Sequence, residues 1–407
     1  MMQALLTSSR RLLRFSGRLI LSGLYLVLGI GIGLLVLEVI FHLNPHLLAG
    51  LRGLGAPAPL DAPLTINSYD VYFSDADEIY WRPDIIRSIP PNADQLEAHV
   101  VFETDELGFR NSAPLPSTAD VVVLGRSQSL GAQNPNPWPD LLARITNWKV
   151  VNLSQPGSSL DVKRGYLTTF GLPRHPRWII LEVSPAMDSI NYRQTSSLLI
   201  QLLPIPLAQQ LIRTYDGYSP QSADPPIYPL TVDLPGRTTQ LTCCIHFLDV
   251  LTIDQSTLQQ SRGWRTFTQT LSALAEDATR QSACVAVLYA PMKPDIYFPL
   301  AENPIQLEPT LGGVIPLRLN QSGELVADPM RRPSILSMQA NALAGRDALA
   351  AYARDNNLLF IDPTSRMVEA ILGGADPFMV YDSHWNNLGH ALAAESVAAA
   401  LQTAECQ

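Results

Sequence analysis

Cysteine is scarce in this chain of 407 residues, which contains four: Cys243, Cys244, Cys284 and Cys406. No two of them form a Cys-x-x-Cys pair, so the sequence does not indicate a zinc site. Adjacent cysteines such as the first two rarely bond to each other. We therefore expect thiols that are mostly unpaired or buried, and one disulfide between distant cysteines is the alternative in an oxidising compartment.

Basic residues are also few beyond the N-terminus, and the net charge is −9. This balance argues against nucleic-acid binding by the main part of the chain. The 33 prolines indicate many loops, especially in 201–235, but they are too dispersed for a low-complexity protein. No feature of the composition calls for an organic cofactor.

Acidic residues are absent before the long apolar run from Leu19 to Phe41. Its ~23 residues would reach about 35 Å as a helix, enough to cross a bilayer with some tilt. Four basic residues precede the run: Arg10, Arg11, Arg14 and Arg18. The positive-inside rule then predicts a cytoplasmic N-terminus and a main domain outside the membrane.

A cleaved signal peptide is the alternative interpretation of this run. The run is long for a signal peptide, and the small-x-small sequence Ala56-Pro57-Ala58 lies well beyond it. We therefore expect an uncleaved single-pass anchor. The predicted organisation is a basic N-terminus (1–18), a transmembrane helix (19–41), a linker (42–66) and one globular domain (67–407) with a loop insertion at about 190–255.

Apolar runs that suit buried strands alternate with segments of helical pattern in the globular part. The expected strands are 121–124, 149–153, 178–183, 284–290 and 358–362. The expected helices are 137–145, 160–170, 264–280, 339–355 and 389–401, with Ser261 as a cap for the third. This alternation predicts an α/β fold with a parallel sheet covered by helices on both faces.

Two distant segments carry residues suited to nucleophilic catalysis. Ser127 follows the strand-like run 121–124, and Asp382 stands two residues before His384 in a loop that opens a helix. A Ser, a His and an Asp from separate segments can form a nucleophile, its base and the group that orients the base. A metal site using the Asp-x-His pair is an alternative, but no third ligand has convincing spacing.

Three blocks of this chain resemble the SGNH/GDSL hydrolase family over roughly 100–190 and 280–400. The blocks are Gly125-Arg126-Ser127, Asn152 to Gly157, and Asp382-Ser383-His384. The last block with its Trp-Asn extension, and the upstream segment Thr104 to Asn111, are similar to membrane-anchored polysaccharide O-acetyltransferases. The resemblance implies a three-layer, flavodoxin-like parallel sheet.

The resemblance also implies roles for individual residues. Ser127 would be the nucleophile, His384 the general base and Asp382 its orienter. The backbone N–H groups of Ser127 and Gly157 would form the oxyanion hole. No metal or organic cofactor is implied.

The sequence departs from the family pattern at two positions. Arg126 stands where the family has Asp, and Met187 stands where the family's third block has an Asn that donates to the oxyanion. Met cannot donate a hydrogen bond, and loss of one donor would slow the reaction by ~10²–10³-fold. Arg126 is a candidate substitute donor.

Other polar residues near these blocks have simpler interpretations. Ser129 is the local alternative nucleophile. We expect Asp188 and Asp362 to cap helices, Lys293 to be solvated, and His390 to pack or cap in the closing helix. Trp385 is expected in the core or in the wall of a pocket.

The sequence therefore predicts a membrane-anchored, extracytoplasmic serine esterase or O-acyltransferase that acts on cell-envelope carbohydrate esters. Its expected partners are the lipid bilayer, a glycan or acyl ester, and an acyl-donating membrane protein. One alternative is a catalytically impaired glycan-binding or assembly protein with the same fold. Another is a tethered scaffold whose function lies in the insertion 190–255.

Overall fold

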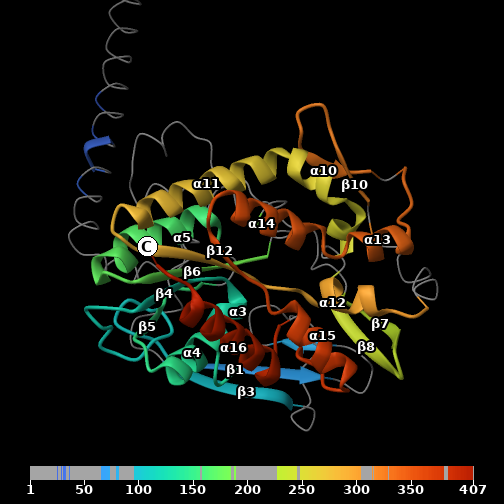
Figure 1. Cartoon of the computed structure of the whole chain (residues 1–407), viewed down its shortest axis with the longest axis horizontal. Coiled ribbons are helices and arrows are strands. Elements are labelled where there is room, and N and C mark those ends of the chain that lie inside the picture. The colour runs from blue at the N-terminus through green and yellow to red at the C-terminus, as the bar shows by residue number, and fades with distance from the viewer. Residues whose placement is uncertain are drawn as a thin grey trace, which may run out of the picture. The chain divides into compact units, whose positions relative to one another are not determined.

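A computed structural model describes most of the chain from residue 96 onward (Figure 1). The described residues are 25, 29, 31–33, 36, 66–73, 79–81, 96–155, 158–184, 188, 227–244, 248–303, 314, 316–328, 330–379 and 384–406. The chain divides into two compact units, 1–58 with 195–218 and 59–194 with 219–407. The second unit contains the sheet and the candidate site.

Five parallel strands form the central sheet of the second unit. In chain order they are β4 (Val121–Leu124), β5 (Val150–Asn152), β6 (Trp178–Val183), β9 (Cys284–Tyr289) and β12 (Leu359–Ile361). Their order across the sheet is β12-β9-β6-β4-β5, the doubly wound flavodoxin-like arrangement. The parallel α/β prediction is confirmed, because each expected strand lies in this sheet within one or two residues of its predicted bounds.

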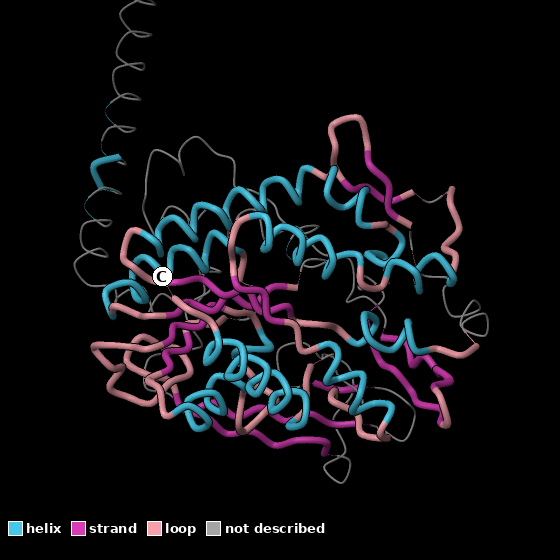
Figure 2. Tube along the Cα trace, in the orientation of Figure 1, coloured by secondary structure: helices cyan, strands magenta, loops and turns pink. Residues whose placement is uncertain are grey.

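Helices cover both faces of the sheet and make three layers (Figures 1 and 2). The helices α5 (Leu160–Tyr166), α11 (Arg262–Thr279) and α14 (Ala344–Asp355) bury apolar side chains on one face. The helices α4 (Trp138–Thr146), α12 (Lys293–Leu300), α15 (Thr364–Leu372) and α16 (Asn387–Thr403) do so on the other. All four residues of β4 are fully buried, as expected for a strand covered on both sides.

Capping side chains define where several helices begin. Ser261 accepts a hydrogen bond from Trp264 N–H at the start of α11, as the sequence predicted. Asn386 accepts from the N–H groups of Leu388 and Gly389 at the start of α16, which satisfies two donors that have no partner inside the helix.

The structure corrects the sequence prediction where segments were expected to be irregular. Within the predicted insertion, β7 (Ile227–Leu234) and β8 (Arg237–Cys244) form an antiparallel hairpin. Its turn contains Gly236 at a φ of +78°, a conformation that glycine adopts readily. A second hairpin joins β10 (Leu317–Leu319) to β11 (Leu325–Ala327).

Three strands before residue 104 form a separate antiparallel sheet. They are β1 (Ile66–Phe73), β2 (Ile79–Trp81) and β3 (Leu96–Glu103), in the order β2-β1-β3. Val100 and Phe102 of β3 pack against Leu130 and Ala132 in the segment that follows β4. This sheet therefore supports the region that carries the candidate nucleophile.

Two further sequence predictions were wrong in detail. The helix expected over 339–355 is two helices, α13 (Ile335–Asn341) and α14. Lys293, the first residue of α12, is 2% exposed rather than solvated.

The predicted transmembrane helix, 19–41, lies largely outside the described residues. No helix within the described ranges is long and apolar enough to cross a membrane. In the first unit the described residues are all helical, and Tyr25, Ile32 and Val36 are 66%, 55% and 52% exposed.

A disulfide joins Cys284, at the start of β9, to Cys406, after α16. The expectation of mostly unpaired thiols is wrong for these two residues, and the alternative of one long-range disulfide holds. The bond closes a loop with a sequence separation of 122 residues, so it restricts the unfolded chain strongly.

We predict that replacing both Cys284 and Cys406 with Ser lowers the free energy of unfolding by about 2–5 kcal/mol, because the unfolded chain gains freedom. Urea unfolding of the oxidised protein and of the double variant measures this difference. Reduced wild-type protein is the control and should unfold at the midpoint of the variant. Equal midpoints for oxidised wild type and variant would contradict the prediction.

Candidate active site

Ser127 begins a short helix, α3 (Ser127–Leu130), three residues after β4 ends at Leu124. From β4 the chain crosses to β5 on one side and then to β6 on the other side of β4. The strand β4 therefore borders the topological switch point of the sheet, where doubly wound folds form their ligand sites. Ser127 is half-buried. As the first helical residue its N–H has no partner within the helix, so the N–H is suited to a developing oxyanion.

Ser129 holds this helix against the sheet. Its N–H donates to Glu182 Oε2 over 2.6 Å, and its Oγ accepts from Trp138 Nε1 over 2.9 Å. Its carbonyl accepts from Asn152 Nδ2 over 2.8 Å. Because Ser129 is fully buried and bonded through three groups, it is an anchor of α3 and does not suit the alternative role of nucleophile.

His384 lies in the loop before α16 and is 8% exposed. Its carbonyl accepts from Met379 N–H over 2.9 Å, and the next residue, Trp385, forms a bridge with Phe378. The fully buried indole of Trp385 donates to the Pro291 carbonyl over 3.1 Å. The loop that carries the candidate base is therefore fixed to the segment after β9.

One hydrogen bond joins the Ser127 segment directly to the His384 segment. The N–H of Trp385 donates to Gln128 Oε1 over 3.0 Å. Gln128 follows Ser127 in the chain, and Trp385 follows His384. The structure thus brings together two segments that the sequence separates by more than 250 residues.

His390 has the structural role expected from the sequence. It is 1% exposed, and its Nδ1 accepts from the N–H of Trp138 at the start of α4 over 3.2 Å. Burial, together with the proximity of Arg110 and His384, lowers the pKa of His390 to about 3. It is therefore neutral near neutral pH, as an acceptor must be.

Arg126, the residue before the candidate nucleophile, pairs with a group of buried charged side chains. Its guanidinium lies 3.4 Å from Asp188 Oδ1, and Lys163 Nζ lies 4.0 Å from the same oxygen. Lys163 is fully buried and donates to the Glu182 carbonyl over 2.8 Å. Burial lowers the pKa of Lys163, whereas Asp188 and Glu182 oppose that change.

The carboxylate of Asp188 has contacts beyond the helix cap that the sequence predicted. Its Oδ2 accepts from the N–H of Ser184 over 2.9 Å while Oδ1 faces Arg126. The ion pair was missed because a lone Asp after a strand is usually a cap. Asp362 lies one residue before Pro363, the N-cap of α15, and accepts from the N–H of Thr364, the first residue of that helix.

Lys163 was also missed from the sequence. The available signal was its position: it lies three residues after buried Leu160 in α5 and four before buried Leu167, the residue that follows α5. This spacing puts it on the apolar stripe. A lysine on such a stripe requires a buried partner.

The segment 104–111 braces the residues around α3. Asn111 exchanges two hydrogen bonds with the backbone of Asn152, at the end of β5, over 2.8 and 2.9 Å. Asp105 accepts from the Asn111 amide over 2.8 Å. These bonds tie the segment to the end of β5, the strand beside β4.

Arg110, in the same segment, donates to a set of backbone carbonyls after α3: those of Leu130, Gly131 and Asn134. It is 5% exposed and its guanidinium lies over the Phe102 ring. Burial lowers its pKa to about 10, so it remains charged at neutral pH. Arg110 therefore holds the loop after α3 close to Phe102 of β3.

Three site predictions fall outside the described residues. They are Asp382 as orienter of His384, Gly157 as the second oxyanion donor, and Met187 at the expected donor position. They remain predictions. Within the described part of the chain, no three His, Cys, Asp or Glu side chains are grouped so that they could hold a metal ion.

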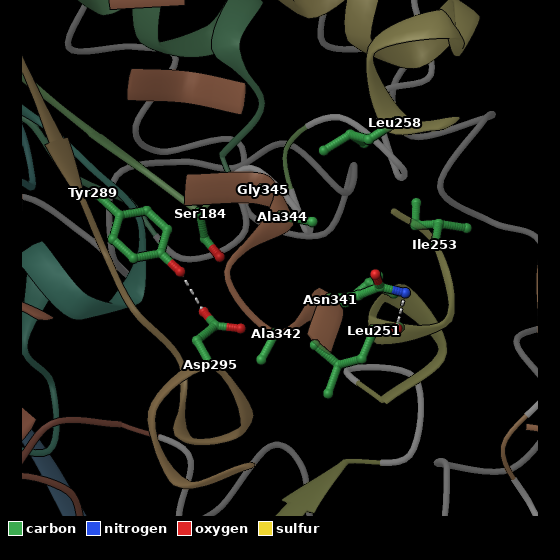
Figure 3. Close-up of a pocket in the computed structure, with 11 residues that line it drawn as sticks. Ser184, Leu251, Ile253, Leu258, Tyr289, Asp295, Asn341, Ala342, Ala344 and Gly345 are labelled. Atoms are coloured by element: carbon green, nitrogen blue, oxygen red, sulfur yellow. Dashed lines mark hydrogen bonds between the residues drawn. The ribbon is translucent and has the colours of Figure 1, made fainter. Parts of the chain in front are cut away.

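A small pocket lies beyond the ends of β6 and β9 (Figure 3). Ser184, Tyr289 and Asp295 form its polar end, and the Tyr289 hydroxyl donates to Asp295 over 2.7 Å. Burial raises the pKa of Asp295 to about 6. The volume of about 20 Å³ is far below the ~150 Å³ of an apolar cavity that binds benzene, so this pocket does not suit a sugar ring.

No family model matches this chain. No curated protein matches it either.

Solved structures of GDSL/SGNH hydrolases and acetyl esterases have similar folds. A lipolytic G-D-S-L family protein from Desulfitobacterium hafniense is 14% identical with a TM-score of 0.36, covering 69% of this chain and 98% of that one. A G-D-S-L family protein from Veillonella parvula is 12% identical with a TM-score of 0.35, covering 70% and 98%. A catalytic mutant of an acetylxylan esterase from Geobacillus stearothermophilus is 12% identical with a TM-score of 0.34, covering 72% and 98%.

At such identities and TM-scores these structures assign neither an activity nor a substrate to this chain. The case for a function therefore rests on the geometry of the site.

We predict that Gly125→Ala destabilises the protein and displaces α3. A Cβ at this position would collide with the Ser129 side chain and would lie 2.6 Å from Glu182 Oε2. Crowding of this kind costs about 1–3 kcal/mol, which urea unfolding would measure.

The matched control is Gly165→Ala in α5, where a Cβ would meet no atom within 4 Å. That change should be neutral or should stabilise the helix by up to about 1 kcal/mol. Equal stability of the two variants would show that α3 does not depend on close packing at Gly125.

Proposed function

We propose that this protein is a membrane-anchored, extracytoplasmic SGNH-like serine esterase or O-acyltransferase that acts on carbohydrate esters of the cell envelope. The observation that carries the catalytic part is the hydrogen bond between Gln128 and Trp385, which brings the Ser127 and His384 segments together. Their location beside the switch point of a parallel sheet supports the same conclusion.

In this proposal Ser127 Oγ attacks the carbonyl carbon of the ester while His384 accepts its proton. The resulting tetrahedral oxyanion receives hydrogen bonds from the N–H groups of Ser127 and Gly157. The C–O bond to the alcohol then breaks, and His384 returns the proton to the departing oxygen. Asp382 orients the imidazole throughout.

The acyl-serine is then attacked by water or by a glycan hydroxyl. His384 takes the proton of the attacking group, and Ser127 leaves with a proton from His384. Water gives an esterase, and a glycan hydroxyl gives a transferase. In the transfer reaction, an acyl-donating membrane protein would be the source of the acyl group.

Arg126 is the candidate substitute for the missing Asn donor. It directly precedes Ser127, its side chain is 18% exposed, and its ion pair with Asp188 involves one terminal nitrogen. A guanidinium has five N–H donors, so this contact leaves others for an oxyanion.

The alternative is a catalytically impaired glycan-binding or assembly protein with the same fold. Its supporting observation is also Arg126, because the ion pair with Asp188 gives this departure from the family pattern a purely structural role.

We predict that a fluorophosphonate probe labels the full-length protein at Ser127 with a stoichiometry near one. Ser127→Ala should abolish labelling, and His384→Ala should slow it by about 10²–10⁴-fold because the general base is lost. Intact-mass spectrometry and the labelling rate measure both effects.

Ser396→Ala in α16 and His175→Asn at the exposed turn before β6 are the matched controls and should label like wild type. Absence of labelling in the wild-type protein, under conditions that label a known serine esterase, would favour the non-catalytic alternative.

The membrane anchor is supported by the apolar run 19–41 and by the exposed, helical Tyr25, Ile32 and Val36. A bilayer would cover such side chains. The disulfide between Cys284 and Cys406 suits an oxidising compartment outside the cytoplasm.

We predict that the full chain stays in the membrane pellet after alkaline carbonate extraction, whereas a chain that begins at residue 46 is released. Protease added to intact spheroplasts should degrade the region beyond residue 46 of the full chain. Protection of that region would contradict the proposed orientation, and release of the full chain by carbonate would contradict the anchor.

A further inference from the structure

We propose that Gln128 is a positioning residue that sets the geometry between the nucleophile and its base. This inference rests on the function proposed above. Gln128 adjoins Ser127 in the chain, and its side-chain oxygen accepts a hydrogen bond from the residue that adjoins His384. A shift in this bond therefore moves the two reacting groups relative to each other.

The segment of the base is held rigidly on the side away from α3. Trp385 is fully buried, and its indole is bonded to the Pro291 carbonyl. Asn386 N–H donates to the Pro377 carbonyl over 3.1 Å. Because these bonds fix the backbone around Trp385, its N–H presents a stationary donor to Gln128.

The nucleophile segment is held from beneath through Ser129, two residues beyond Ser127. Trp138 links this anchor to the closing helix, since it donates to Ser129 Oγ and to His390 Nδ1. These two bonds act at Ser129, two residues from Ser127, and at His390, six residues from His384. The Gln128 bond acts one residue from each, so it has the greater effect on their separation.

Alignment of this kind matters because a displacement of about 1 Å between reacting groups can cost ~10²-fold in rate. To bind the Trp385 N–H, residue 128 needs a hydrogen-bond acceptor at the end of a side chain as long as that of Gln. Glu supplies the same acceptor, whereas Met has a similar length and no comparable oxygen.

The test compares Gln128→Met with Gln128→Glu in the full chain, with p-nitrophenyl acetate as substrate and the fluorophosphonate as probe. Gln128→Met should lower kcat and the labelling rate by about 10–100-fold and leave KM within about twofold of wild type. Gln128→Glu should retain most of the activity because it restores the acceptor.

Gln339→Met is the control, since Gln339 donates to the Ala301 carbonyl in another part of the molecule. It should leave kcat unchanged. A wild-type kcat for Gln128→Met would overturn the inference, as would an equal loss in Gln128→Glu. A higher KM at unchanged kcat would also overturn it, because that result describes a residue that binds substrate.

Hydrogen exchange at the Trp385 amide tests the link without any catalytic readout. Exchange should be faster in Gln128→Met than in wild type and in Gln128→Glu. If the wild-type protein is inert to the probe, the proposed enzymatic function fails, and the exchange rates alone then decide whether Gln128 holds the two segments together. Unchanged exchange in Gln128→Met would show that it does not.

Discussion

The carboxylate of Glu182, at the end of β6, accepts the N–H of Ser129 in α3, and the placement of the candidate nucleophile depends on this contact. A four-residue helix cannot sustain itself, because nucleating a helix costs more than its few hydrogen bonds return. The helix α3 exists because Ser129 is bonded to a strand, to Trp138 and to Asn152. Ser127 is thereby presented by the sheet rather than by a flexible loop.

A carboxylate buried at this depth needs compensation, and the surrounding charges supply it. Lys163 binds the Glu182 backbone and lies close to Asp188, which in turn pairs with Arg126. The group contains two cationic and two anionic side chains, so its formal charge is balanced. Removing any one of them would leave a buried charge without its partner, which is more costly than never having had the pair. Arg126, the departure from the family pattern, is therefore part of a balanced set.

The sheet could be predicted from the sequence because its strands are short apolar runs whose burial depends on local composition. The run 178–183 is one strand with those bounds. The hairpin 227–244 was missed because its prolines favour loops, although Pro229 is accommodated within β7. The burial of Lys163 and Lys293 was missed because burial depends on partners that arrive from other elements.

In the candidate site, too, features that depend on local sequence could be predicted, whereas contacts between distant segments could not. Ser127 and His384 could be proposed from the sequence because each stands in a short pattern that can be recognised locally. The roles of Gln128 and Arg110 could not be proposed, because both consist of contacts with backbone groups of other segments. Every residue has a backbone carbonyl, so the sequence does not show which one a side chain will bind. The pairing of Cys284 with Cys406 was undecided for a related reason: the sequence does not show that the end of the chain returns to the start of β9.

The candidate nucleophile and the candidate base are thus attached to the core through different elements. Ser127 is fixed through the strand ends of β4 and β6, whereas His384 is fixed through the loop after β9 and the start of α16. Each attachment contributes to folding whether or not the two groups are aligned. Alignment is set by the few polar contacts that cross between them, and these bury little apolar surface. Stability and reactivity therefore depend on different bonds in this structure, so a change at the crossing contacts can disturb the chemistry while leaving the fold intact.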